Sequence, residues 1–421
     1  MATRDQCASG SVAGQLESAG ELRYFARQPI LHIDGRVHGY ELLFRQAPEA
    51  VFRGESGEAV ETMLDNAVIF GLEALTNGLP AFVTCTEEAL IEQLVLVLTP
   101  NLTVLCFPAR HAPSDRLMDA IRTLKARGYR FALDDFVWND RLRPLAEQAD
   151  YVRLDFRRFD RAEQEQLYRL RGGSTILAAQ KVETPKDYLE AGAKGFTLFQ
   201  GSYFCRPLLL KRRKAPANCM LHFEIVRELY HHPIDLARVS ELVRRDASLT
   251  YRLLRLVNSP VYAIQQEIRR IESAILALGE ETFRRVVSLA VISELNTDQP
   301  VEILRMALQR ARFCELAAGQ CDRDPSEQYL LGMLSLLPAM LGLPMEEIAP
   351  TLPLRGAICE ALAGASNPER CLLGWLEFHE RGDWAACDRI TVAHRLDRWE
   401  LARRYESAVL WSEVSLRSAV A

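Results

Sequence analysis

The first half of the chain alternates short apolar runs with segments of helical periodicity, and this alternation most constrains its fold. Strands that alternate with helices favour a parallel sheet with the helices outside it, either open or closed into a barrel. Helices are expected between the strands, for example over 59–75, 114–127 and 185–191. The strands are expected over 25–32, 39–44, 81–84, 102–107, 131–133, 151–154, 175–178 and 195–199.

The second half, from about residue 218, has apolar residues at helical spacing and no stretch that predicts a strand. Proline and glycine breaks divide it into helices of roughly ten to fifteen residues. Four basic residues at 211–214 precede Ala-Pro-Ala, and we interpret 211–217 as a charged linker rather than an anion-binding patch. The predicted organisation is a disordered tail at 1–22, an α/β domain at 23–210, this linker, and an all-helical domain at 218–421.

Composition is that of an ordinary globular protein of two or three domains, with 421 residues, 48% of them hydrophobic and 25% charged. The net charge of -5 argues against a general nucleic-acid coat. The ten cysteines form no CxxC pair or zinc-type cluster, which favours reduced thiols in a cytoplasmic protein. The N-terminus lacks a secretory signal, and the most apolar stretch, 330–343, is too short for a bilayer. We therefore expect a cytoplasmic protein without a membrane partner.

Two adjacent carboxylates, Asp134 and Asp135, follow the apolar strand predicted at 131–133. Paired acids at the end of a barrel strand are well placed to hold a divalent cation, which prefers oxygen ligands. A strand followed by an acidic turn is the alternative interpretation. The stretch by itself does not decide between the two.

Residues 23–208 resemble an EAL domain, a family that hydrolyses the second messenger cyclic di-GMP. The resemblance implies a modified TIM barrel with its site at the C-terminal ends of the strands, although this stretch is shorter than a typical member. The sequence ELL replaces EAL, and Val137 replaces the glycine of DDFG. The matching motifs are HGYELLFR at 38–45, DDF at 134–136, ADYVRLD at 149–155, AQKVET at 179–184, and QG at 200–201 followed by Pro207.

The family reaction is a phosphodiester hydrolysis assisted by two divalent cations. By resemblance, Glu41, Asp134 and Asp135 are vestigial metal ligands with at most weak affinity for Mg²⁺ or Mn²⁺, and no cofactor is required. The same resemblance makes four residues candidate contacts to cyclic di-GMP. These are Leu43, Arg45, Arg153 and Gln200.

Four other positions depart from the family pattern, so no catalytic residue is assigned. Thr84 replaces an Asn, and Cys106 replaces a Glu with a soft ligand that is protonated near neutral pH. Arg153 replaces a Lys, and its planar fork is no substitute for a compact ammonium. Gln180 replaces a Glu and carries no charge. Such losses cost orders of magnitude in rate, so we predict no useful phosphodiesterase activity.

Residues 218 to about 400 resemble an HDOD domain, a helical relative of HD-type phosphohydrolases, on the stretches at 253–262 and 269–279. Ser335 and Leu336 stand where metal-binding relatives carry a His-Asp pair. Four histidines lack acidic partners at ligand spacing, and we interpret them as solvated or core residues. They are His222, His231, His232 and His379.

The fold expected is therefore an EAL-like α/β barrel followed by an all-α HDOD domain. The favoured function is a non-catalytic signalling protein, in which the barrel senses a nucleotide or serves as a protein scaffold and the HDOD domain provides the output. The partners expected are cyclic di-GMP and signalling proteins that bind both domains, and a homodimer is left open.

Two other functions stay open. One is an active cyclic di-GMP phosphodiesterase with atypical metal ligands. The other is a nucleic-acid-binding regulator that uses arginines of the helical half, although charged outer helix faces balanced by Asp and Glu are the favoured interpretation. The arginines are Arg244, Arg245, Arg252, Arg255, Arg269, Arg270, Arg284 and Arg285. We also expect the late aromatic residues to pack helices. They are Trp375, Trp384, Trp399, Tyr405 and Trp411.

Overall fold

A computed structural model describes most of the chain. The predicted tail at 1–22, the predicted linker at 211–217 and most of the helix predicted at 59–75 lie outside the described residues. The described residues are 24–45, 72–108, 111–137, 139–158, 175–205, 219–230, 233–259, 262, 264, 268–296, 299–352 and 354–420.

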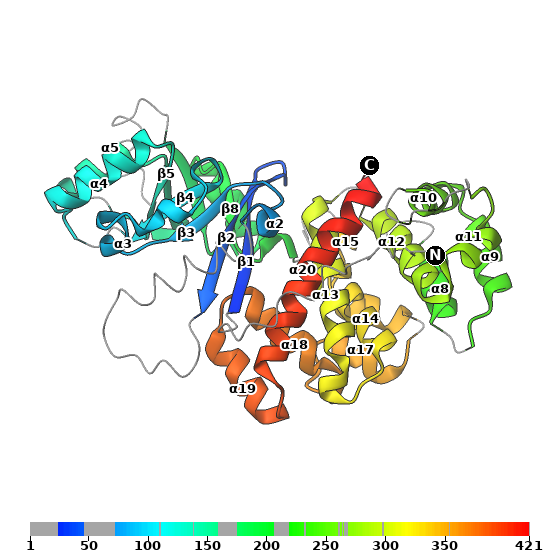
Figure 1. The fold of residues 1–421 in the computed structure, drawn as a ribbon. Coiled ribbons are helices and arrows are strands. Elements are labelled where there is room, and N and C mark those ends of the chain that lie inside the picture. Colours follow the sequence, from blue (N-terminus) through cyan, green and yellow to red (C-terminus); the bar gives the residue numbers. More distant parts are fainter. Residues whose placement is uncertain are drawn as a thin grey trace, which may run out of the picture.

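The first half is a closed barrel of eight strands, which confirms both the fold class and all eight predicted strands (Figure 1). β1 runs antiparallel to both of its neighbours, β2 and β8, and the other neighbouring strands are parallel. The strands are β1 (Tyr24–His32), β2 (Val37–Arg45), β3 (Ala81–Thr84), β4 (Thr103–Pro108), β5 (Arg130–Asp134), β6 (Tyr151–Asp155), β7 (Ile176–Gln180) and β8 (Leu198–Gln200).

Apolar and aromatic side chains fill the inside of the barrel, and they leave the mouth to polar residues. Side chains two residues apart on a strand point to the same side. Thr84, Asp134 and Gln200 follow Phe82, Ala132 and Leu198 by two residues on the same strands. Their side chains therefore point to the same side, at the C-terminal end of the barrel. The cluster that fills the interior comprises Ile30, Phe82, Val104, Cys106, Ala132, Tyr151, Ala178 and Leu198.

Helices lie outside the strands, and local capping explains where two of them begin. Ser114 caps α4 by accepting a hydrogen bond from Leu117 N–H, and Thr184 and Asp187 form a capping box at α7. The predictions at 114–127 and 185–191 are thereby confirmed. The helices around the barrel are α2 (Leu72–Thr76), α3 (Glu87–Ile91), α4 (Asp115–Ala126), α5 (Arg143–Gln148) and α7 (Pro185–Ala193).

The second half is helical throughout its described residues. Its helices run from 4 residues in α16 to 23 in α20, so the expected ten to fifteen residues is wrong at both extremes. Prolines break the chain around α15 and α16, and α20 contains neither Pro nor Gly. The helices are α8 (Cys219–Leu229), α9 (Leu236–Arg244), α10 (Ala247–Val257), α11 (Ile271–Leu278), α12 (Glu280–Leu295), α13 (Val301–Ala317), α14 (Pro325–Leu334), α15 (Leu337–Leu341), α16 (Met345–Ile348), α17 (Gly356–Leu362), α18 (Cys371–Glu380), α19 (Trp384–His394) and α20 (Arg398–Val420).

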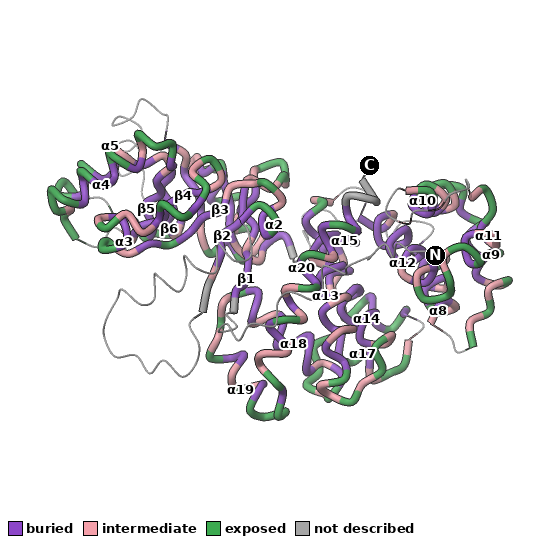
Figure 2. The backbone as a smooth tube through the Cα atoms, in the orientation of Figure 1, coloured by how far each residue is buried: buried purple, intermediate pink, exposed green. Residues whose placement is uncertain are grey.

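The last helices join the two halves of the molecule. In Figure 1, α18 and α20 lie between the barrel and the helices α8–α12, and Figure 2 shows buried residues along the barrel strands and along α13 and α14. Phe25 of β1 packs edge-on against Tyr405 of α20, with ring centroids 5.5 Å apart. The His379 ring of α18 lies 2.8 Å from the backbone carbonyl of Phe25. The expected packing role is confirmed for Trp375 and Tyr405, which are fully buried.

A buried network of charges connects β1 to α13 and α20. The Arg27 guanidinium donates hydrogen bonds to Glu413 (2.9 Å), to Gln309 (3.2 Å) and to the Leu75 carbonyl (2.8 Å). Arg305 pairs with Glu413 and, at 2.8 Å, with Glu302, which also accepts a hydrogen bond at 2.9 Å from Tyr40 of β2. Each buried charge has a partner in the other half or beside it. Separating the two halves would therefore leave buried charges without their partners.

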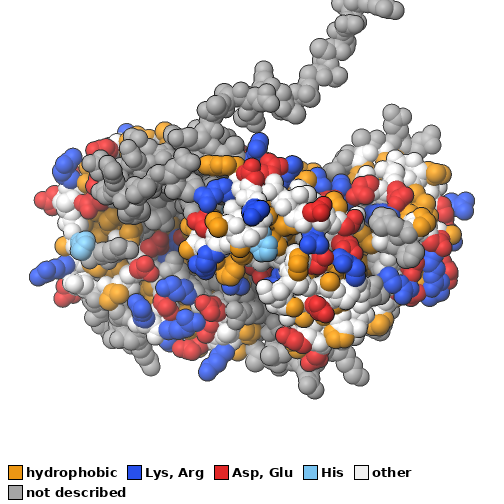
Figure 3. Space-filling view, turned by 90° about the horizontal axis from the view of Figure 1, so that it is seen from below, with side chains coloured by type: hydrophobic (Ala, Val, Ile, Leu, Met, Phe, Trp, Pro, Cys, Tyr) orange, Lys and Arg blue, Asp and Glu red, His pale blue; other side chains and the backbone are white. Residues whose placement is uncertain are grey.

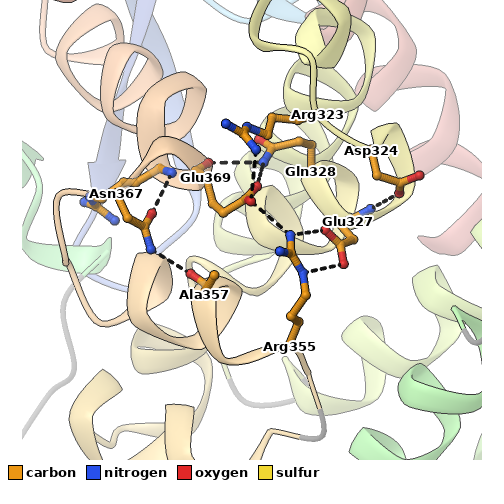
Figure 4. Close-up of polar contacts among 9 residues, drawn as sticks. Arg323, Asp324, Glu327, Gln328, Arg355, Ala357, Asn367 and Glu369 are labelled. Atoms are coloured by element: carbon orange, nitrogen blue, oxygen red, sulfur yellow. Dashed lines mark hydrogen bonds and ion pairs between the residues drawn. The ribbon is translucent and has the colours of Figure 1, made fainter.

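The start of α18 is anchored by a second network, shown in Figure 4. Glu369, just before α18, is only 5% exposed and accepts hydrogen bonds from Arg355 (2.9 Å) and Gln328 (3.3 Å). Arg355 also pairs with Glu327 of α14 at 2.5 Å. α18 is therefore held at its start by α14 and the loop before α17, and near its end by the barrel.

Within the described residues, no helix on its own has the length and apolar character needed to cross a membrane. One pair, Pro325–Leu341 with Met345–Thr351, passes that test by length and composition, and it is bent by 109°.

Arg27 tests whether the network between the halves stabilises the protein. We expect Arg27→Ala to lower the free energy of unfolding by about 3–5 kcal/mol, the usual cost of removing one partner from a buried ion pair. The measurement is urea-induced unfolding followed by circular dichroism. Arg36→Ala is the control, because Arg36 is an exposed barrel arginine that pairs with exposed Asp34. Equal midpoints for the two variants would contradict the stabilising role.

Candidate functional site

The mouth of the barrel opens into a cavity of about 630 Å³ that the helical half helps to enclose. The barrel contributes the C-terminal ends of its strands, and α13 and α18 contribute the outer wall. Six residues predicted from the sequence line it together. They are Glu41, Thr84, Asp134, Asp135, Gln180 and Gln200.

Arg153 of β6 is completely buried and contacts three side chains that line the cavity. Its guanidinium lies 2.7 Å from a Glu41 carboxylate oxygen and 3.4 Å from Asp134 Oδ1. It also donates hydrogen bonds of 3.1 Å to Gln200 Oε1 and to Cys106 Sγ. In the paired register of β5 and β6, Asp134 and Arg153 stand side by side, which explains their contact.

Arg153 keeps its positive charge at this position. Burial lowers the pKa of Arg153, but the Glu41 and Asp134 carboxylates raise it well above its usual value. The Phe82 ring lies 5.4 Å from the guanidinium and adds a cation–π contact. A fixed monovalent cation therefore offsets part of the negative charge of Glu41 and Asp134, two of the predicted metal ligands.

The residues present do not fit a dinuclear metal site. The Arg153 guanidinium lies between Glu41 and Asp134, where a shared cation would have to bind, and burial raises the pKa of Cys106 well above its usual value. A buried neutral thiol does not supply the anionic oxygen that Mg²⁺ requires. Within the described ranges, no three His, Cys, Asp or Glu side chains converge as metal ligands would.

Asp134 is the titratable group most affected by this arrangement. Burial raises its pKa to about 7, Arg153 opposes this shift, and the nearby carboxylates Glu41 and Asp135 add to it. Its Oδ1 atom is buried and makes no hydrogen bond that meets normal geometry. Burial therefore favours the neutral form of the Asp134 carboxyl, and its pKa lies above that of an exposed aspartate.

Two residues at the mouth hold a left-handed backbone that side chains rarely adopt. Asp135 directly follows β5 with φ of 49°, and Lys181 directly follows β7 with φ of 59°. Both line the cavity and both are exposed. Backbone strain of this kind costs roughly 1–3 kcal/mol and is concentrated at functional sites. Gly201, with φ of 150°, lets β8 approach the Val182 carbonyl where a Cβ would lie 2.0 Å away.

The candidate contacts to cyclic di-GMP have different surroundings. Gln200 lines the cavity, but its amide also donates to Glu41 and, at 2.9 Å, to Gln28. Leu43 lies against Gly382 and is outside the cavity lining. The side chain of Arg45 lies outside the described residues.

The expected contact between Arg153 and a phosphate does not fit this geometry. Its side chain is completely buried and its guanidinium already pairs with Glu41 and Asp134. The sequence shows that Arg stands at this position where the family has Lys. It could not show that the guanidinium turns inward to the carboxylates.

Several cavity residues were not found from the sequence. Gln28 stands opposite Glu41 in the β1–β2 register. The pairing of these two predicted strands could therefore have placed Gln28 next to Glu41 in the site. No sequence signal points to the cavity residues of the helical half, because only tertiary packing brings them to the barrel. These residues are Met306, Arg310, Glu377, Glu380 and Arg381.

In the helical half, Ser335 and Leu336 differ in their surroundings. Ser335 accepts a hydrogen bond of 3.1 Å from Arg310, and Leu336 is buried. His222 is buried, which agrees with the expected core position. The expectation that it lacks an acidic partner is wrong, because its ring lies 3.0 Å from Asp246. The residues are 24 positions apart, so spacing gave no sign of the pair. His231 and His232 lie outside the described residues.

Most of the singled-out arginines are paired with acidic residues, as expected. Arg245 pairs with Glu241 at 2.6 Å, Arg252 with Glu294 at 2.9 Å, and Arg285 with Glu315 at 2.8 Å. Arg284 departs from the expected outer face, because it is only 2% exposed. Figure 3 shows basic and acidic side chains interspersed over one face of the molecule. On that face, the mixture of charges gives no support to a nucleic-acid-binding surface.

Comparisons with known proteins cover both halves. An HDOD domain model matches residues 216–343. YuxH of Bacillus subtilis, a protein described as uncharacterised, is 32% identical over 402 residues, which is 92% of this chain and 97% of YuxH. CdgJ of Vibrio cholerae, named a cyclic di-GMP phosphodiesterase, is 31% identical over 398 residues, which is 93% of this chain and 92% of CdgJ.

The chain belongs to the EAL–HDOD family. Its relatives match almost end to end, so the order of an EAL-like barrel and an HDOD domain is confirmed. Solved structures match the barrel more weakly. The PaMucR phosphodiesterase in complex with c-di-GMP is 20% identical with a TM-score of 0.36, covering 43% of this chain and 94% of that one. BlrP1 of Klebsiella pneumoniae is 18% identical with a TM-score of 0.36, covering 43% and 54%.

The raised pKa of Asp134 predicts a pH dependence of stability. The carboxyl has a pKa near 3.9 when unfolded and about 7 when folded, so between these values the folded state holds the additional proton. Its contribution to stability is complete below about pH 4 and falls as pH rises to 7. We expect the melting temperature of the wild type to fall more steeply over this window than that of Asp134→Asn.

The measurement is differential scanning fluorimetry in buffers of constant ionic strength. Asp119→Asn is the control, because Asp119 lies on the exposed face of α4 with its side chain 74% exposed. Parallel curves for the wild type and Asp134→Asn would show that Asp134 does not titrate in this window.

Proposed function

We propose that this EAL–HDOD protein is a non-catalytic component of cyclic di-GMP signalling. In this proposal the barrel receives a signal by binding, as a nucleotide sensor or a protein scaffold, and the HDOD half carries the output. The family relationship supports a place in cyclic di-GMP signalling. The observation that supports a loss of catalysis is the position of the Arg153 guanidinium between Glu41 and Asp134.

The physical reason concerns charge at the reacting phosphate. Metal-assisted hydrolysis requires divalent cations to activate water and to neutralise the phosphate. A guanidinium fixed beneath the cavity supplies one positive charge, holds no water ligand and blocks shared coordination by the two carboxylates. Gln180 and Cys106 carry no compensating anionic oxygen. The barrel is therefore suited to recognise a ligand rather than to hydrolyse it.

An active phosphodiesterase with atypical metal ligands is the second candidate. The observation in its favour is the name of CdgJ, a relative that matches over nearly its whole length. The candidate requires Arg153 to leave Glu41 and Asp134 so that cations can bind. The two candidates therefore differ in a measurable way, which is hydrolysis by the purified protein.

We expect the wild-type protein, with cyclic di-GMP and either Mg²⁺ or Mn²⁺, to turn over substrate no faster than Glu41→Ala or a buffer blank. Chromatographic separation of intact and hydrolysed nucleotide is the measurement. A wild-type rate above the blank that is lost in Glu41→Ala would overturn the non-catalytic proposal and favour the second candidate.

Restoring three of the four departed family residues tests whether these changes exclude metal. We expect the triple variant Cys106→Glu, Arg153→Lys, Gln180→Glu to bind Mn²⁺ at least about tenfold more tightly than the wild type, since even residues that only support metal ligands contribute 10–100-fold. Isothermal titration calorimetry is the measurement, and Arg153→Lys alone is the matched control. Equal Mn²⁺ affinity in the wild type and the triple variant would show that the changed residues do not exclude metal.

A further inference from the structure

The cavity at the barrel mouth is closed by the helical half. α13 contributes Met306 and Arg310 to its wall, and the end of α18 contributes Glu377, Glu380 and Arg381. A volume of about 630 Å³ lies within the 300–1,000 Å³ that small-molecule sites usually occupy. A ligand that fills this space would therefore touch both halves of the protein.

Two cations in this wall remain available for an anionic ligand. Arg27 is engaged with Glu413, and Arg310 pairs with Glu380 at 2.7 Å. Lys181 of the barrel and Arg381 of the helical half are exposed, and neither has an ion-pair partner within the part of the chain that the structure describes.

The charge of the cavity makes these two cations decisive. On its floor, the Arg153 guanidinium lies 2.7 Å from Glu41 and 3.4 Å from Asp134, and its single positive charge offsets part of their negative charge. At its rim, the exposed carboxylates of Asp135 and Glu183 repel an anion. An anionic ligand thus depends on Lys181 and Arg381, and an arginine fork suits phosphate oxygens.

We propose that Lys181 and Arg381 together bind the phosphates of one nucleotide, so that the ligand site is shared between the barrel and the helical half. The proposal rests on the non-catalytic function above and adds how the ligand is held and read. An isolated barrel lacks Arg381 and half of this site. Binding requires no divalent cation, because Arg153 already occupies the place between the carboxylates.

A continuous chain of hydrogen bonds ties this wall to the barrel and to α14. Gln200 donates to Gln28 (2.9 Å), and Gln28 donates to the Glu380 carbonyl (3.1 Å). The Glu380 carboxylate accepts from Arg310 (2.7 Å), which also donates to Ser335 at the end of α14 (3.1 Å). A nucleotide bound to Arg381 stabilises the end of α18 and, through these bonds, the arrangement of the two halves that this structure shows.

Calorimetry with cyclic di-GMP in the presence of EDTA tests the shared site on the full chain. We expect the wild type to bind and both Arg381→Ala and Lys181→Ala to bind at least tenfold more weakly. Arg389→Ala is the matched control, since Arg389 is an exposed arginine of α19 outside the cavity lining. It should bind within twofold of the wild type.

Hydrogen exchange on the same proteins reports the coupling. We expect cyclic di-GMP to slow exchange in residues 371–381 of the wild type, and this protection to be lost in Arg381→Ala even at saturating nucleotide. Binding by the wild type with an unchanged affinity in Arg381→Ala and no protection of α18 would overturn the shared site but not the non-catalytic function.

The remaining outcomes separate the two proposals. If the wild type does not bind cyclic di-GMP, the shared site is wrong, and a protein scaffold remains for the barrel. If the wild type hydrolyses cyclic di-GMP when Mn²⁺ replaces EDTA, the non-catalytic function is wrong, and the affinity ratio between Arg381→Ala and Arg389→Ala still decides whether the helical half contributes to the site.

Discussion

The ion pairs of Arg153 with Glu41 and Asp134 set the chemistry of this protein. A completely buried charge is costly, and it persists here because two carboxylates, an amide oxygen and an aromatic ring surround it. The same contacts hold Glu41, Gln200 and Asp134 in place at the mouth. The barrel thus carries an internal cation where its family is expected to bind metal, and the shape and charge of the cavity follow from that exchange.

A second set of buried charges determines which parts of the protein enclose the cavity. Arg27, Glu413 and Arg305 join β1 to α13 and α20, and each has a partner that solvent would otherwise have to replace. Because these contacts fix the helical half over the barrel mouth, the site belongs to neither domain alone. Under the proposed signalling role, a ligand that binds in the cavity would stabilise this arrangement of the two halves.

The repeating features of the fold were predictable, and the contacts across it were not. Period-two and helical patterns located all eight strands, because they depend on neighbours a few residues apart. The motif positions Glu41, Asp134 and Gln200 line one cavity, and their role as site residues stays a prediction. The direction of the Arg153 guanidinium was missed, because it depends on burial and on the β5–β6 register. The His222–Asp246 pair was missed because its members lie on different helices.

The sequence by itself determined the order of a strand–helix barrel and an all-helical half, and the family. These follow from local periodicity and from residue identity, which need no knowledge of distant contacts. The tertiary structure alone decided that Arg153 pairs inward and that α18 closes the mouth. Both outcomes depend on residues far apart in the chain, such as Gln28 and Glu380, whose approach is set by the burial of charge between packed halves.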